Sequence, residues 1–234
     1  MVCNVITADK ANRLFWLGRY AERVYISLHL LRRYYDKVLD GDISDLKEYY
    51  RCLGVDCADM DQESEECQYS QLYDKSNGCS IATSLDLTND NGIVLRRDIT
   101  SESLSYIHLS QMLLAECAAV SEKNITLLQP ITDYMLAFFG SIDERVFDNR
   151  IRLFIKIGRL IENLDLHVRF NYPYFRIEEA FLSLKEYIER SESGVADPFA
   201  LESLNELINE EQYTNQDETY KERLLSNLNI LIMV

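Results

Sequence analysis

Apolar side chains recur every three or four residues along most of this chain, a spacing that is typical of amphipathic α-helices. The clearest example covers residues 7–38, where one apolar stripe continues along the whole stretch. The same spacing predicts further helices over residues 44–53, 101–123, 125–139, 143–170, 175–191, 198–209 and 217–232. We therefore expect an all-α helical bundle of about six to eight helices. Helices 7–38 and 143–170 should be the longest and should pack together.

An eight-residue pattern occurs in both of these long helices, starting at Leu17 and again at Ile157. Gly, Arg and Glu recur in it with a constant offset of 140 positions. The residues of the two copies are Gly18, Arg19, Glu22 and Arg23, and then Gly158, Arg159 and Glu162. A glycine inside a helix costs about 1 kcal/mol relative to alanine, so its recurrence indicates a close helix–helix contact. We predict two central helices related by a pseudo-twofold internal repeat.

Two interpretations of this repeated motif remain open. Apolar residues on several sides of both helices indicate that the motif is largely buried, where an unpaired charge is very costly. In the structural interpretation, the glycines allow the helices to cross closely and the Arg and Glu side chains form ion pairs. In the functional interpretation, Glu22 and Glu162 face one cavity and bind a metal ion or a cationic substrate. The structural interpretation is favoured, because buried ion pairs are more often structural than catalytic.

The charge of the chain restricts its partners. The formal net charge is −15, from 39 acidic and 24 basic residues. Binding to nucleic acid or to an anionic membrane requires a basic surface, so the charge argues against both partners. The first residues lack a cationic lead and a long apolar core, and the apolar stretch 230–234 is too short to span a bilayer. We expect a soluble, cytoplasmic protein, and the oligomeric state is left open.

Residues 52–97 differ from the rest of the chain. Residues 52–74 contain seven acidic side chains and neither Lys nor Arg, and residues 89–92 read Asn-Asp-Asn-Gly, which is a turn signal. We expect one all-α domain, residues 1–234, in which 52–97 is an acidic, Cys-containing and loop-rich insertion. The expectation includes at most a minor β element near residues 80–97, and mobility over residues 52–80.

No enzyme or metal signature stands out in the sequence. The six cysteines form no Cys-x-x-Cys pair, so we expect reduced thiols and no metal site. None of His29, His108 and His167 completes the Glu-x-x-His pattern of bundle di-metal sites. A Gly-rich phosphate loop and a Gly-x-Ser-x-Gly elbow are also absent from the sequence. We assign no catalytic residue and no cofactor.

Residues 11–23, Ala-Asn-Arg-Leu-Phe-Trp-Leu-Gly-Arg-Tyr-Ala-Glu-Arg, resemble the opening of the bacterial alpha-E domain family. This is an uncharacterised helical family named for its Glu-Arg motif. The family also carries a second Gly-Arg…Glu-Arg helix, which residues 158–162 resemble. The chain departs from the family pattern at Asn12 and Tyr25, where acidic residues are usual, and at Asn163, which replaces the second Arg of Glu-Arg.

The resemblance implies a function in the context of peptide ligation. Genes of the family tend to lie beside those of ATP-grasp peptide-ligase-like and transglutaminase-like proteins. We therefore expect a non-catalytic helical accessory or binding protein whose partner is an ATP-grasp or transglutaminase-like protein. The 15 tyrosines fit this hypothesis, because Tyr is enriched at protein interfaces. The alternative is an enzyme of the same system that uses the buried Arg/Glu residues, with or without a divalent metal.

Overall fold

The computed structural model describes residues 6–55, 65–120, 125–191 and 194–233, and over these residues it contains twelve α-helices and one short 3₁₀-helix. The chain divides into two compact units. Unit 1 combines residues 1–19 with residues 148–234, and unit 2 comprises residues 20–147. The longest helix, α1 (Ala8–Asp40), contributes its first turns to unit 1 and the remainder to unit 2.

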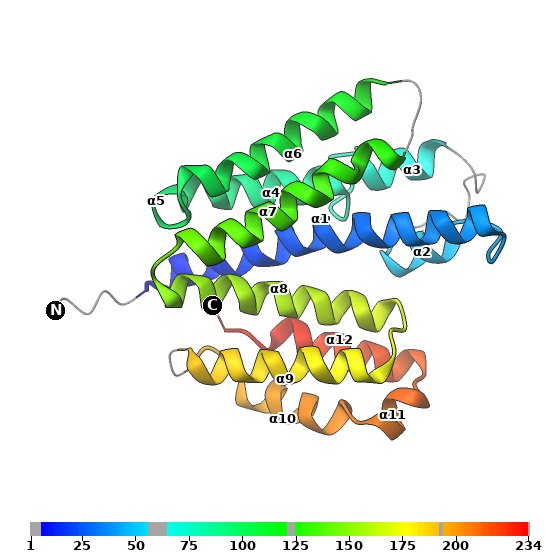
Figure 1. Ribbon diagram of the computed structural model, residues 1–234. Helices are drawn as coiled ribbons and strands as arrows, with labels where there is room; N and C mark the ends of the chain where they lie inside the picture. Colours follow the sequence, from blue (N-terminus) through cyan, green and yellow to red (C-terminus); the bar gives the residue numbers. More distant parts are fainter. Residues whose placement is uncertain (1–5, 56–64, 121–124, 192–193, 234) are drawn as a thin grey trace. The chain divides into compact units, whose positions relative to one another are not determined.

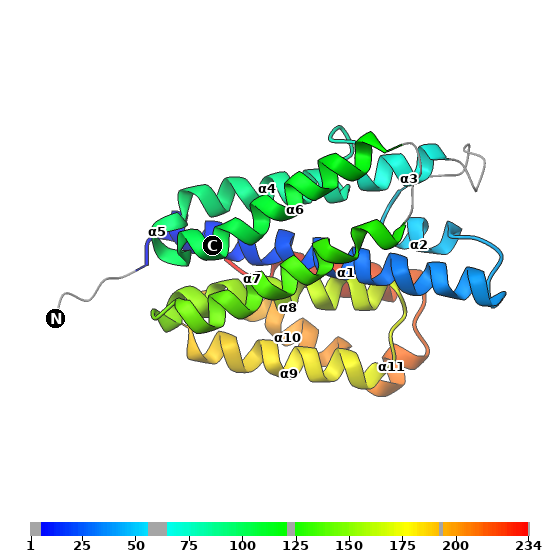
Figure 2. The ribbon, with the colours of Figure 1, turned by 45° about the horizontal axis from the view of Figure 1, so that its top comes forward.

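Unit 1 is a helical bundle built around the helix α8. Its helices after the start of α1 are α8 (Asn149–Arg169), α9 (Tyr174–Arg190), α10 (Pro198–Leu207), α11 (Glu210–Thr214) and α12 (Glu218–Ile230). Helix α8 packs against α9 and α12, and α10 packs against α12 (Figure 1). Helix α11 packs against α9 (Figure 2). Asp or Asn side chains accept a hydrogen bond from the first turn of α8, α10, α11 and α12, which is why these helices begin where they do.

Apolar side chains from every helix of unit 1 meet in one core. Fully buried members include Ile157, Leu164, Ile177, Leu204 and Leu224. Each comes from the apolar stripe of its own helix, so the periodicity of the sequence specifies which face is turned inward. Burying side chains of this kind contributes about 1.5–3 kcal/mol each.

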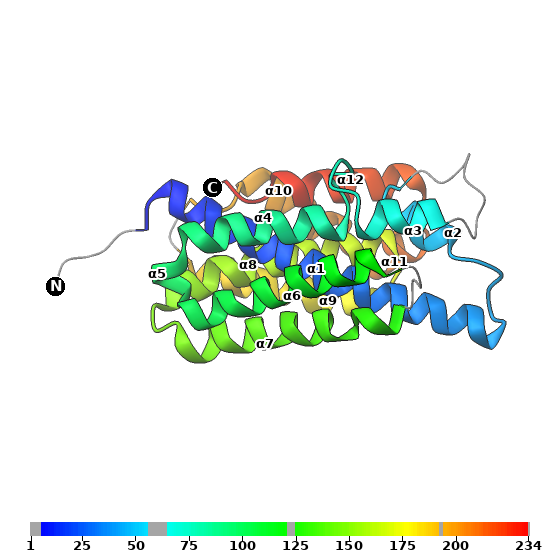
Figure 3. The same ribbon diagram turned by 90° about the horizontal axis from the view of Figure 1, so that it is seen from above.

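Unit 2 contains the rest of α1 and six further α-helices. They are α2 (Lys47–Cys52), α3 (Glu65–Leu72), α4 (Ile81–Val94), α5 (Arg96–Ile99), α6 (Ser101–Ala119) and α7 (Gln129–Arg145), with the 3₁₀-helix η1 (Ile125–Leu128) before α7. Helix α6 packs between α4 and α7, and the three lie side by side in Figure 3. The hydroxyl groups of Ser103 and Ser141 form a buried 2.7 Å hydrogen bond that joins α6 to α7.

Several expectations for unit 2 are wrong. Residues 89–92 do not form a turn but lie inside α4, which Ser80 caps by accepting a hydrogen bond from the Thr83 amide. Gly140 does not end a helix, since α7 continues through it to Arg145.

Twelve α-helices over the described residues also exceed the expected six to eight. The described part of the chain has no β-strand, only an isolated bridge between Ala196 and Ile232 in unit 1.

The acidic segment is more helical than expected. Within residues 52–97, α3 and α4 account for much of the part that the structure describes. The predicted mobility of residues 52–80 stays a prediction, and residues 56–64 of that stretch lie outside the described residues. The prediction that residues 1–234 form a single domain stays a prediction.

One stretch of the described residues, Ile125–Arg145, is long and apolar enough to cross a membrane by length and composition alone. It forms η1 and α7 in unit 2. Ile131, Met135 and Phe138 from this stretch are completely buried inside the protein. The core helix of a water-soluble protein passes the same test, so this stretch is weak evidence for a membrane span.

Candidate functional site

The glycines of the repeated motif lie where the backbones of α1 and α8 meet in unit 1. A Cβ atom added to Gly18 would overlap the carbonyl oxygen of Ile155, and one added to Gly158 would overlap the carbonyl oxygen of Phe15. Each glycine therefore faces the residue three positions before the other glycine, and the contact is reciprocal. The close helix–helix contact expected from the paired glycines is present at this crossing. The wider internal repeat and its pseudo-twofold axis are not confirmed.

Arg19 reaches from this crossing into a buried ion pair. Its Nε donates a hydrogen bond to Oε2 of Glu162 at 2.9 Å, and Nη1 and Nη2 both donate to Oδ1 of Asn229 at 3.3 Å. The guanidinium carbon lies 5.0 Å from the centre of the Trp16 ring, within the range of a cation–π contact. The side chain of Arg19 is 5% exposed and that of Glu162 is fully buried. Arg19 and Glu162 are thus both buried and paired with each other.

The chemistry of this arrangement is dominated by the cost of burying charge. Removing two ions from water is expensive, and their attraction offsets the cost only when further hydrogen bonds satisfy them. Asn229 and the Trp16 ring provide such contacts for Arg19. With both charged groups engaged and shielded from water, a substrate in solution reaches neither of them unless the helices separate.

The remaining motif residues are distributed over both units. Arg159 is half-buried in unit 1. Glu22 and Arg23 belong to unit 2, where Glu22 is 4% exposed and Arg23 is half-buried. The structure therefore brings Gly18, Arg19, Gly158 and Glu162 together in unit 1, and it places the Glu-Arg pair 22–23 in unit 2.

Sequence reasoning missed two groups near this centre. Asn229 is an exposed residue in the last turn of α12, and no periodicity or motif marks it. Asp165 is 4% exposed and accepts a 2.7 Å hydrogen bond from Nε of Arg169. The Asp–Arg spacing of four residues on one helix is a known stabilising pattern and was a usable signal.

The histidines do not assemble a metal site in the part of the chain that the structure describes, where no three His, Cys, Asp or Glu side chains are grouped to hold an ion. His29 and His108 are exposed, and His167 stacks on Tyr172 with ring centres 4.1 Å apart. Partial loss of water around the ring, with a smaller effect of the Arg33 charge, lowers the pKa of His29 below its usual value.

The cysteines differ from expectation at one position. Cys52 and Cys117 are buried free thiols, and Cys79 is an exposed free thiol. Cys67 is disulfide-bonded, so the expectation of reduced thiols throughout is wrong for this residue. Cys3 and Cys57 lie outside the described residues.

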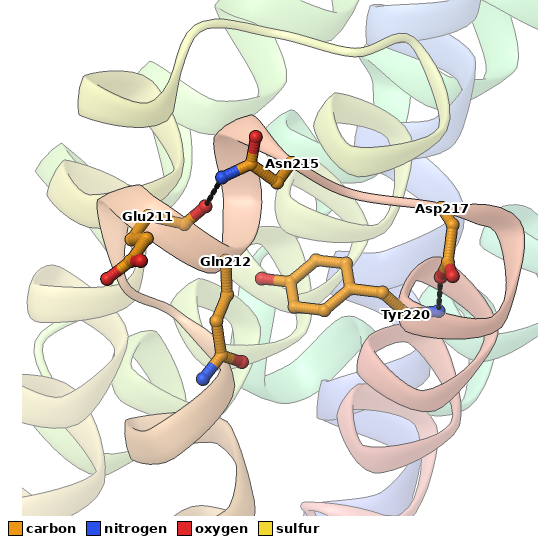
Figure 4. A pocket seen from close by; sticks show the side chains of 5 residues that line it. All are labelled: Glu211, Gln212, Asn215, Asp217 and Tyr220. Atoms are coloured by element: carbon orange, nitrogen blue, oxygen red, sulfur yellow. Dashed lines mark hydrogen bonds between the residues drawn. The ribbon is translucent and has the colours of Figure 1, made fainter.

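A shallow groove lies on unit 1 at the junction of α11 and α12 (Figure 4). Its volume is about 460 Å³, and its lining residues are Glu211, Gln212, Asn215, Asp217 and Tyr220. The Tyr220 hydroxyl donates a 2.6 Å hydrogen bond to the carbonyl oxygen of Leu207, and burial raises its pKa to about 12. Asp217 accepts a hydrogen bond from the Tyr220 amide as the cap of α12. Both polar groups are thus already used by the fold, and no basic side chain lines the groove.

Comparison with known proteins gives one match. The family model Alpha-E, described as a predicted alpha-helical domain with a conserved ER motif, matches residues 8–214. Residues 22–23 are a Glu-Arg pair within the matched range. No curated protein and no solved structure matches the chain.

Proposed function

Because the chain belongs to the Alpha-E family, we propose that it is a non-catalytic helical accessory protein that binds a protein partner. The partner is an ATP-grasp peptide-ligase-like or transglutaminase-like protein that forms or modifies peptide bonds. The function is carried out in the cytoplasm, and it requires neither a metal nor a cofactor in this chain.

The dry ion pair between Arg19 and Glu162 is the observation that carries the proposal. A catalytic carboxylate must touch its substrate, but Glu162 is fully buried and accepts a hydrogen bond from Arg19 at 2.9 Å. The two glycines bring the backbones into contact beside this pair and leave no space for a substrate there. Gly18, Arg19, Gly158 and Glu162 are thus occupied in building unit 1. The function is then expected on the surface that unit 1 supports.

Unit 1 has exposed aromatic side chains within an acidic stretch of sequence. Between residues 174 and 230 the chain contains thirteen acidic and five basic residues. Exposed aromatic side chains occur among them, with Phe175 at 58% and Phe199 at 78% exposed. Aromatic side chains are enriched at protein–protein interfaces, whereas Asp and Glu are depleted there, so the exposed Phe residues are the part of this surface that fits a binding function.

Binding is tested with three purified proteins. The chain is mixed with the ATP-grasp protein and, separately, with the transglutaminase-like protein encoded beside it, and the heat of binding is measured by calorimetry. The proposal expects a saturable complex with at least one of them. It also expects the chain alone to hydrolyse no ATP and to form no peptide bond. Failure of both proteins to bind, or turnover by the chain alone, would contradict the proposal.

A paired substitution separates this proposal from the enzyme alternative. The double change Arg19→Met with Glu162→Leu removes both charges and retains side-chain volume, which is often neutral or stabilising for a buried ion pair. A binding protein with this double change keeps its affinity for the partner. An enzyme that uses the Arg/Glu residues loses its activity while remaining folded.

The proposed location has its own test. Disulfides are rare in the cytoplasm, and the bond at Cys67 therefore opposes this part of the proposal. Cells are lysed in an alkylating reagent, and the thiol at position 67 is measured by mass spectrometry. An alkylated Cys67 supports the cytoplasm, whereas an oxidised Cys67 would place the chain in an oxidising compartment.

A further inference from the structure

The outer face of α6 in unit 2 carries exposed apolar side chains. Seven exposed side chains between positions 105 and 119 lie on this side of the helix, and we call them the α6 face: Ser105, His108, Leu109, Met112, Ala115, Glu116 and Ala119. At 100° per residue they lie within one arc of about 120°. Met112 at the centre is 61% exposed and Leu109 is 40% exposed. Exposed apolar surfaces with large side chains at their centre are characteristic of interaction sites.

The charge of the α6 face separates it from the rest of this acidic chain. Between Ser103 and Val120 the only charged residue is Glu116, whereas the whole chain has a net charge of −15. Two copies of such a chain repel each other through their acidic surfaces, but not through a face that is nearly neutral. A lipid surface is a poorer partner, because interfacial helices carry Lys and Arg beside their apolar face and this face has none.

The sequence of the α6 face is also complementary to itself. In an antiparallel twofold contact centred on Met112, every residue faces the position at the same distance on the other side of Met112. His108 then faces Glu116 of the second copy, and Leu109 faces Ala115 of the second copy. Symmetry produces each of these contacts twice. A hydrogen-bond donor meets a carboxylate, and a large side chain meets a small one, as close helix packing requires.

We propose that the protein forms a twofold dimer through the α6 face, with the two α6 helices antiparallel and Met112 at the axis. This inference goes beyond the proposed accessory function and does not depend on it. The occupant of the α6 face is a second copy of this chain.

Sedimentation equilibrium of the full chain tests the dimer. The expected mass is twice the 27.3 kDa of one chain. Met112→Lys places two like charges at the axis and is expected to weaken the dimer by about tenfold or more. Leu182→Lys is the matched control, because Leu182 is 55% exposed on α9 in unit 1, and its dimer should be unchanged.

A charge exchange tests whether His108 of one copy lies opposite Glu116 of the second copy. His108→Glu alone sets carboxylates against each other and should weaken the dimer, as should Glu116→Lys alone by removing the acceptor. The double variant His108→Glu with Glu116→Lys restores opposite charges and should recover the affinity of the unmodified chain. If the double variant is as weak as the sum of the single changes, the antiparallel pairing is wrong.

Crosslinking tests the register in a chain whose exposed Cys79 is replaced by serine. Met112→Cys puts two thiols at the axis, and mild oxidation should link the two copies. Ala119→Cys puts its two thiols fourteen residues apart along the helices, about 21 Å, and should not link them. The Cys79→Ser chain without a new cysteine measures the background.

Two outcomes would overturn the proposal. The first is a monomer at every concentration that sedimentation can reach. The second is a monomer that floats with zwitterionic or anionic phospholipid vesicles and is released from them by Met112→Lys, because the occupant would then be a membrane.

Discussion

The centre of unit 1 and the outer face of α6 in unit 2 reverse the usual distribution of polar and apolar groups. In unit 1, Arg19 and Glu162 are charged and buried, whereas in unit 2 Met112 and Leu109 are apolar and exposed. The buried charges are tolerated because each has a partner within hydrogen-bonding distance. The exposed apolar groups lack such a partner within the described part of unit 2. A charged side chain can therefore be buried where it has a hydrogen-bonding partner, and an apolar side chain can remain exposed where no neighbour covers it.

The largest effect is expected from breaking the buried pair. Glu162→Ala leaves the Arg19 charge without its carboxylate in a dry place, and loss of one member of such a pair costs about 3–5 kcal/mol. Urea denaturation of the variant and the unmodified chain gives this difference in the free energy of unfolding. Glu186→Ala is the control, because Glu186 pairs with Arg190 on the exposed side of α9 and such pairs contribute about 0–1 kcal/mol. Equal effects of the two substitutions would contradict the structural interpretation.

A smaller loss is expected from a methyl group at the helix crossing. Gly18→Ala places a Cβ against the backbone of Ile155, which cannot rotate away, and overpacking of this kind costs about 1–3 kcal/mol. Gly140→Ala is the matched control in α7, where an added Cβ meets nothing within 4 Å. There the same substitution should stabilise the chain by about 0.5–1 kcal/mol through helix propensity. Thermal unfolding should therefore shift in opposite directions for the two variants.

Removing both charges should cost less than removing one. In the Arg19→Met and Glu162→Leu double variant no charge is left unpaired, so its free energy of unfolding should lie close to that of the unmodified chain. The two single changes measured beside it complete a double-mutant cycle. An additive result would mean that the two side chains do not depend on each other, in conflict with their 2.9 Å contact.

The smallest effect is expected on the α6 face. Met112→Gln exchanges one exposed side chain for another, and surface changes of this kind stay within about 0.5 kcal/mol. The urea midpoint of Met112→Gln should match that of the unmodified chain at low protein concentration, where dimers are dissociated. A large destabilisation by Met112→Gln would show that Met112 packs within unit 2. The α6 face would then no longer differ from the centre of unit 1 in the way described above.

The periodicity of the sequence was sufficient for most helices but not for α4. Residues 89–92 read as a turn because Asn, Asp and Gly favour turns when only local preferences act. In the structure Gly92 lies against Leu104 of α6, where a larger residue would collide with the leucine methyl group. The packing of α4 on α6 outweighs the local preference for a turn, and the local signal was misleading for that reason.

The candidate site was predictable only in part. The paired glycines indicated a crossing because their cost within a helix requires a compensating contact. Asn229 was not predictable, because an exposed Asn at the end of a helix has no periodic position and its role depends on how α12 docks on unit 1. Likewise, the sequence did not indicate that Arg19 pairs with Glu162 rather than with an acid on its own helix.

Unit 1 is built from two segments that are far apart in the sequence, and this affects the order in which the chain can fold during synthesis. The ribosome delivers residues 6–19 before unit 2, but their neighbours in unit 1 begin only at Asp148, after all of unit 2. Arg19 is therefore synthesised long before Glu162 and Asn229, which accept its hydrogen bonds in the folded protein. Unit 2 can form on its own sequence in the meantime, as domains generally do. Unit 1 must wait for a long-range closure, so the helix crossing at Gly18 and Gly158 is expected to be among the last parts to form.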